Sequence, residues 1–204
     1  MSELSEQLQS ALPPGLHAGD VVDWDSVEHA YGSRFPRDYM EFVARYGRGT
    51  VQETISVRLP SVAGPVRPYT AVTRLDPARL DAMSDASEGL GAHRLEDVLI
   101  WGDTVAADTL CWVAAGDDPD SWPVAVYNSD DGWCVFECGM VEFLLGILRA
   151  EFDVCPIGDL GAWGMAGAAK FLHNREEQRL YDSGIDPWTG EVNPFHGNEF
   201  TYGV

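Results

Sequence analysis

The sequence predicts an α+β protein in which N-terminal helices and a C-terminal helix pack on one largely antiparallel sheet of about five to six strands. Helical periodicity fills the first 46 residues, and short strand-like runs follow. Most connections between these runs are too short for crossover helices, which indicates an antiparallel meander. The chain is 45% hydrophobic and holds seven Trp, so it can bury a sizeable core. We expect one α+β domain over residues 1–155 and an appendage over residues 156–204.

Three amphipathic helices are predicted before the first strand, over residues 2–12, 23–31 and 36–46. Asp25 and Glu28 have the spacing of a capping box for the second helix, and Gly32 would end that helix. Pro36 suits the first position of the third helix, because its missing N–H has no intrahelical partner there. Gly47 and Gly49 would terminate the third helix.

Alternating or apolar runs of strand length come next, at residues 54–59, 98–101, 109–113, 123–127 and 133–136. A short helix is predicted over residues 78–88. A helix over residues 140–148 is apolar almost all round, so we expect it to be buried against the sheet. The tight turn at 128–132 and the longer connection at 116–120 both carry several aspartates.

The composition changes after residue 156. Glycine recurs every third residue at Gly158, Gly161, Gly164 and Gly167, which favours a loop or a close-packed face of small residues. A helix is predicted over 171–181. We expect this appendage to pack on the domain or to extend from it.

The charge is strongly negative and unevenly distributed. The chain has 33 acids and 13 bases, a net charge of −20, and residues 76–151 alone hold 16 acids and 3 bases. Such a field repels nucleic acid phosphates and anionic lipid and attracts a basic protein surface. We therefore expect no nucleic acid or membrane partner. The alternative is that the acidity serves only solubility.

The sequence shows no motif for a metal, a cofactor or a catalytic nucleophile. Glycine-rich phosphate loops, nucleophile elbows and zinc-ligand spacings are missing, and the turn at 128–132 does not fit a calcium-binding loop. The four cysteines are predicted to be buried free thiols. No apolar run reaches the length of a membrane span, and we expect a cytoplasmic location.

The acids of the strand connections are the candidate contacts for a partner. We expect their carboxylates to converge on one exposed face, with Trp122 and Trp133 as exposed aromatic anchors beside them. The alternative for these two tryptophans is core packing. The candidate acids are Asp103, Asp108, Asp117, Asp118, Asp120, Asp130 and Asp131.

The sequence contains the short motifs Trp24-x-x-Val-Glu28, Phe35-Pro-x-Asp-Tyr39 and Tyr46-Gly-x-Gly49, with Gly32 and Phe42 between them. Together these motifs resemble the opening signature of the SUKH superfamily, and later segments fit it over roughly residues 20–150. The resemblance implies an α+β fold and no enzymatic activity. It also implies that the matched residues determine the fold: aromatic residues in the core and glycines at special backbone positions. These residues are Trp24, Glu28, Gly32, Pro36, Tyr39, Phe42, Gly47 and Gly49.

Fungal members of this superfamily are regulators of cell-wall synthesis, and many bacterial members resemble immunity proteins against polymorphic toxins. We therefore expect a non-enzymatic immunity protein that neutralises a basic, nuclease-type protein toxin. A regulatory or scaffolding module with an endogenous partner is the alternative, and a metal-dependent enzyme using the acidic loops is a third possibility. The sequence leaves both a monomer and a homodimer open.

Overall fold

The strands of the computed structural model form one sheet. The structure describes residues 2–62, 71–84 and 87–192, and within them eight strands pair antiparallel in the order β7-β6-β5-β4-β2-β1-β8, with β3 beside β4. The predicted α+β class is confirmed. The strand bounds are β1 Gly49–Val51, β2 Ile55–Val57, β3 Thr73–Arg74, β4 Val98–Thr104, β5 Thr109–Val113, β6 Val124–Asn128, β7 Gly132–Phe136 and β8 Phe171–His173.

The strand count exceeds the expected five to six. Strands β1, β3 and β8 have only two or three residues each. The sequence around these three strands shows no extended two-residue alternation, whereas the equally short β2 lies in the alternating run at 54–59.

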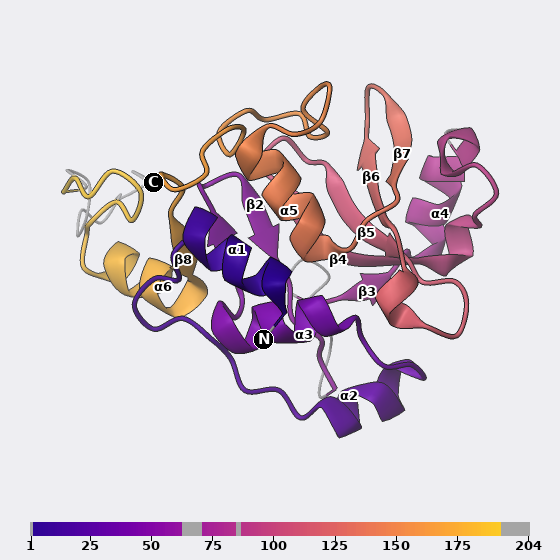
Figure 1. The fold of residues 1–204 in the computed structure, drawn as a ribbon, viewed down its shortest axis with the longest axis horizontal. Coiled ribbons are helices and arrows are strands. Elements are labelled where there is room, and N and C mark those ends of the chain that lie inside the picture. The colour runs from indigo at the N-terminus through magenta and orange to yellow at the C-terminus, as the bar shows by residue number, and fades with distance from the viewer. Residues whose placement is uncertain (1, 63–70, 85–86, 193–204) are drawn as a thin grey trace, which may run out of the picture.

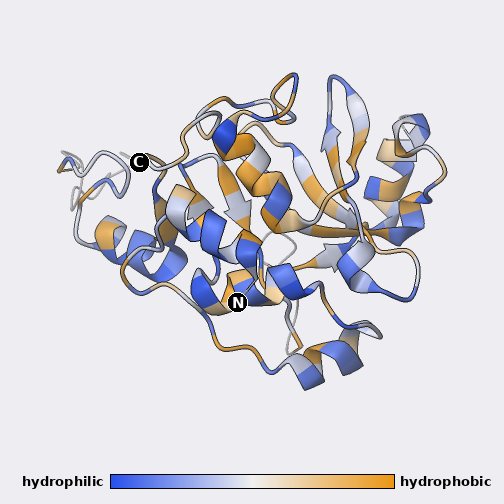
Figure 2. Cartoon of the chain, in the orientation of Figure 1, coloured by the Kyte–Doolittle hydropathy of each residue, from blue (hydrophilic) through white to orange (hydrophobic). Residues whose placement is uncertain are grey.

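Helices cover both faces of the sheet (Figure 1). On one face α1, α3 and α5 enclose the main core, where Trp101, Trp112 and Tyr39 are fully buried. On the other face α4 and a short 3₁₀ helix cover a smaller core that includes Trp133. Figure 2 shows the apolar residues gathered on α5 and the strands. The helix bounds are α1 Glu3–Ala11, α2 Trp24–Tyr31, α3 Arg37–Arg45, α4 Pro77–Ser84, α5 Met140–Arg149 and α6 Asn174–Asp182.

The N-terminal helices begin slightly differently from the prediction. The expected capping box of Asp25 and Glu28 is wrong, because Asp23 caps α2: its Oδ1 accepts a hydrogen bond of 3.2 Å from the backbone N–H of Ser26. Pro36 precedes α3 at the cap position instead of opening the first turn. Asp23 lies only two residues before Asp25 and has the same side chain, so the sequence alone did not decide which of the two aspartates caps the helix.

Most of the signature residues occupy the expected kinds of position. Tyr39 and Phe42 are buried, whereas Trp24 is only partly buried and packs on Tyr39 with ring centroids 6.1 Å apart. Gly32 and Gly47 have φ of +73° and +74°, the left-handed region that glycine adopts without strain. These two glycines therefore end their helices as predicted.

Gly49 starts strand β1 and does not cap a helix. A Cβ built on Gly49 would lie 2.2 Å from the backbone oxygen of Leu172 on β8. Glycine is required there because β1 and β8 approach too closely for any side chain.

The C-terminal segment joins the sheet. Phe171–His173 forms strand β8 on the free side of β1, so the predicted helix over 171–181 starts only at Asn174. The ring of Phe171 packs against Phe42 and Tyr46 at 6.0 and 5.2 Å between centroids. The main core therefore includes a side chain from this segment.

A partly buried polar cluster joins this segment to the N-terminal half. Asp20 bonds His173 Nε2 at 2.9 Å, Arg175 Nη1 at 2.7 Å and the backbone N–H of Arg48 at 2.8 Å. Burial raises the pKa of Asp20, but these donors together outweigh it and hold the pKa below its usual value. His173 also accepts from the backbone N–H of Arg175 at Nδ1, so Nε2 carries the proton that it donates to Asp20.

Candidate protein-binding site

Four loops meet at one end of the sheet. They are the β1–β2 turn (52–54), the β4–β5 connection (104–108), the β6–β7 turn (128–132) and the first part of the segment after α5 (151–161). Figure 1 shows the β6–β7 turn and the orange segment after α5 at the upper edge. We call these four segments the acidic loop end.

The buried carboxylate of Asp108 joins three of these loops. It is 1% exposed and accepts hydrogen bonds from Thr104 Oγ1 at 2.6 Å, Asn128 Nδ2 at 2.7 Å and the backbone N–H of Gly158 at 2.8 Å. Asn128 in turn accepts from the backbone N–H of Asp130 at 2.8 Å. A buried carboxylate with three donors has its hydrogen-bonding capacity satisfied, so Asp108 fixes the loops. The expectation that Asp108 contacts a partner is therefore wrong.

A second contact ties the segment after α5 to the β1–β2 turn. Thr54 Oγ1 donates to Asp159 Oδ1 at 2.9 Å, and the backbone N–H of Gly161 donates to the same oxygen at 2.7 Å. A Cβ on Gly158 would lie 3.1 Å from the Cβ of Ala106, so the loops also pack closely there. The acidic loop end is therefore a packed surface with a defined shape.

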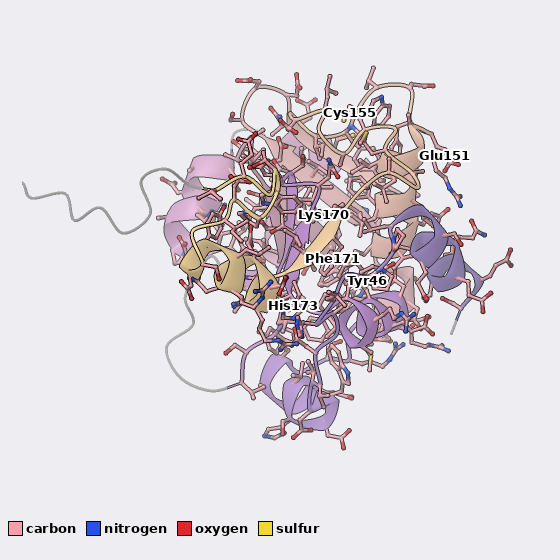
Figure 3. All side chains as sticks on the ribbon, turned by 90° about the vertical axis from the view of Figure 1, so that its left-hand side faces the viewer. Tyr46, Glu151, Cys155, Lys170, Phe171 and His173 are labelled. Carbon is pink, nitrogen blue, oxygen red and sulfur yellow. The ribbon has the colours of Figure 1, made fainter. Side chains whose placement is uncertain are left out.

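Exposed acids and exposed apolar side chains share this end. Val105, Val154 and Leu160 are 68%, 76% and 66% exposed. The four loops contain no Lys, Arg or His. Figure 3 shows Cys155 near the top of the molecule and Glu151 lower on its right-hand side. The exposed acids are Glu53, Asp130, Asp131, Glu151 and Asp153.

Within the described residues, only Glu151 of these exposed acids has an ion pair, with Arg149 at 3.7 Å. The other four carboxylates have no ion pair in this part of the chain, so an external cation can reach them. The arrangement of apolar side chains among charged ones resembles a protein-binding patch, in which an apolar centre is surrounded by a polar rim.

The aspartates of the β5–β6 connection lie at the opposite end of the sheet. Asp120 bonds Arg34 at 2.9 Å and Arg37 at 2.6 Å, and Asp118 bonds Arg34 at 3.1 Å. The hydrogen bond from Arg34 is the main reason that the pKa of Asp120 falls to about 2. These two acids hold their loop against the start of α3, while Asp117 is exposed.

The expected convergence of all candidate acids on one face is therefore wrong. Successive connections of an antiparallel meander alternate between the two ends of the sheet, so the β5–β6 loop cannot lie beside the turns that precede and follow it. Asp130 and Asp131 belong to the acidic loop end, and Asp117 belongs to the other end.

Three further candidate contacts are also held inside the fold. The exposure expected for Trp122 and Trp133 is wrong, since they are 5% and 4% exposed and pack in the two cores. Asp103 is half-buried and pairs with buried Arg58 at 3.0 Å. Both tryptophans therefore pack in the core, which was the alternative to exposed anchors.

The four cysteines differ in exposure. All four cysteines are free, but only Cys111 is buried and Cys134 is exposed, so the expectation of four buried thiols is wrong. Among the described residues, no three His, Cys, Asp or Glu side chains are grouped to hold a metal ion. No helix in the described part is long and apolar enough to cross a membrane.

Sequence reasoning missed several residues of the acidic loop end, among them Glu53, Asp153 and Asp159. One pattern could have found most of them: between Arg94 and Lys170 the only basic residue is Arg149. This base-poor stretch runs past residue 156, where the appendage was expected to begin.

The comparisons with known proteins identify no relative: no family model, no curated protein and no solved structure matches this chain. The resemblance to the SUKH superfamily stays a prediction.

Proposed function

We propose that this chain is a non-enzymatic binding protein that neutralises a basic protein toxin, and that the acidic loop end is its contact surface. The observation that carries the proposal is the acidic loop end itself: four fixed loops with exposed carboxylates, exposed Val and Leu side chains and no basic residue. The resemblance to SUKH immunity proteins supports the choice of a toxin as the partner.

Charge and apolar contact act on different steps of binding. A cluster of like charges raises the rate at which an oppositely charged partner is encountered, and this acceleration declines with salt. Val105, Val154 and Leu160 supply area that is desolvated on contact, which lowers the rate of dissociation. Because the loops are already fixed by Asp108 and Asp159, little conformational entropy is lost on binding.

The test is co-expression with the product of the gene next to its own. We expect the neighbouring product to arrest growth when expressed alone, and co-expression of this chain to restore growth. The purified pair should form a complex whose association rate falls as salt is raised. Absence of both rescue and complex would refute the toxin proposal, and a complex without toxicity would favour the endogenous-partner alternative.

Two charge-reversal variants locate the contact surface. Glu53→Lys with Asp130→Lys changes two exposed acids of the acidic loop end, and we expect association to slow by about tenfold or more at low salt. Asp81→Lys with Asp117→Lys changes the net charge equally, but at α4 and the opposite end of the sheet. Equal slowing by both variants would show that only net charge matters and would remove the acidic loop end from the proposal.

A further inference from the structure

A groove of about 550 Å³ opens at the acidic loop end, between strand β7 and the segment after α5. Its size lies within the range of sites that hold a small molecule or a protruding side chain. The walls are mostly apolar, and they include Val126, Cys134, Phe136, Phe152, Cys155 and Ile157.

The groove exists because β7 is the last strand on this side of the sheet. In the register, Cys134 faces Val126 on β6, so its side chain lies on the same face of the sheet as the main core. Phe136, two residues further on, is covered by Phe143 of α5 and by Phe152, with ring centroids 5.2 Å away in each case. The described residues do not cover Cys134 in this way, and its side chain is exposed.

The charged residues that line the groove are both acidic. Asp131 and Asp153 are its charged lining residues, and neither has an ion pair within the described part of the chain. The loops that form this end hold no basic residue. An apolar slot between two unneutralised carboxylates attracts a cation and favours an apolar group beside it.

We propose that this groove binds a basic segment of the partner, which inserts one large apolar side chain between Cys134 and Phe152 while flanking Lys or Arg side chains pair with Asp131 and Asp153. The inference rests on the proposed function, because it assigns part of the contact surface to one partner feature. Apolar anchors that enter a pocket, with charges around them, are the usual centres of binding energy in protein interfaces.

Cys134 provides a direct readout of groove occupancy. Burial raises the pKa of Cys138 to about 12 and also raises the pKa of Cys111 and Cys155, so these thiols react slowly near neutral pH. A neutral maleimide should therefore modify exposed Cys134 first, as peptide mapping would verify. An occupant of the groove covers this sulfur and slows its modification.

The probes are synthetic peptides in which two Lys residues flank a single Phe on each side. We expect saturable protection of Cys134, with the modification rate lowered about elevenfold at a peptide concentration of ten times Kd. Replacing the Phe by Ala, or every Lys by Glu, should abolish protection. Equal modification rates with the Lys–Phe peptide and these control peptides would overturn the proposal.

Matched variants test the charge contacts. Asp131→Asn with Asp153→Asn should weaken protection by about tenfold or more in peptide concentration, whereas Asp81→Asn with Asp117→Asn should leave it unchanged. Unaltered protection in the first variant would also refute the proposal. Both acids of the first pair are exposed and outside ion pairs, so the variant should retain the fold.

The outcome separates the groove from the toxin proposal. If the neighbouring product forms a complex that leaves Cys134 fully reactive, the toxin proposal stands and the groove assignment fails. If the peptides protect Cys134 while the neighbouring product neither arrests growth nor binds, the groove assignment stands and the toxin proposal fails.

Discussion

Substitution of Asp108 by alanine tests whether one buried carboxylate fixes the acidic loop end. The change deletes the acceptor for Thr104 Oγ1, Asn128 Nδ2 and the backbone N–H of Gly158, at 2.6, 2.7 and 2.8 Å. A buried donor left without an acceptor costs about 1–3 kcal/mol. Asn128 can turn its amide toward water, so we count only the Thr104 hydroxyl and the backbone N–H of Gly158, and we expect a loss of about 2–6 kcal/mol in the free energy of unfolding.

Urea unfolding measures this loss, with Asp130→Ala as the control. Asp130 is an exposed acid of the same end whose side chain makes no hydrogen bond in the described structure, and its removal should change the free energy of unfolding by no more than about 0.5 kcal/mol. Hydrogen exchange should show faster exchange at Gly158 and in the β6–β7 turn of the Asp108 variant. A loss below about 1 kcal/mol would refute the assignment of Asp108 as the residue that orders these loops.

Three further predictions concern other parts of the fold. Gly49→Ala should separate β8 from β1, because the new Cβ would lie 2.2 Å from the backbone oxygen of Leu172. Limited proteolysis should then cut the chain between α5 and α6. A chain that stays intact would contradict this prediction. The hydrogen bond from Arg34 is the main reason that the pKa of Asp120 falls from 3.8 to about 2 in the folded state. The ionised Asp120 therefore adds its full stabilisation to the fold above pH 4, and this stabilisation is lost as the pH falls toward 2. Asp120→Asn should flatten the decline of the free energy of unfolding at acid pH, as measured by urea unfolding. Trp122→Ala should cost about 3–5 kcal/mol in urea unfolding, since the side chain is 5% exposed; a cost below about 1 kcal/mol would restore it as a surface anchor.

The parts of the fold that repeat a pattern over many residues could be predicted from the sequence. A regular series of apolar side chains in the sequence predicted strands β4 to β7, the run that contains the short strand β2, and the helices near residues 3–11, 24–31, 37–45 and 140–149. Strand β8 was read as part of a helix. Its pairing with β1 depends on Gly49, over a hundred residues away, and local periodicity carries no such information.

The candidate site was predicted less well, for a topological reason. Acids in turns were correctly recognised as a feature of the chain, but whether a turn lies at one end of the sheet or the other depends on strand order and direction. Burial depends equally on distant contacts: Asp108 looks like any turn aspartate until the segment containing Gly158 folds over it. Counting the strands from Thr109 to Phe136 would have separated the acids of the β5–β6 loop from those of the β6–β7 turn.

The position of β8 at the margin of the sheet also has a consequence for biosynthesis. Strand β8 emerges from the ribosome after every other described strand, yet it covers β1, and Phe171 completes the aromatic cluster around Phe42 and Tyr46. A nascent chain that ends before Phe171 therefore leaves β1 as an open strand edge beside uncovered aromatic rings, a combination that promotes association between chains. Protection from aggregation during translation thus depends on the late docking of β8 and on Asp20, which bonds His173 and Arg175 at its end.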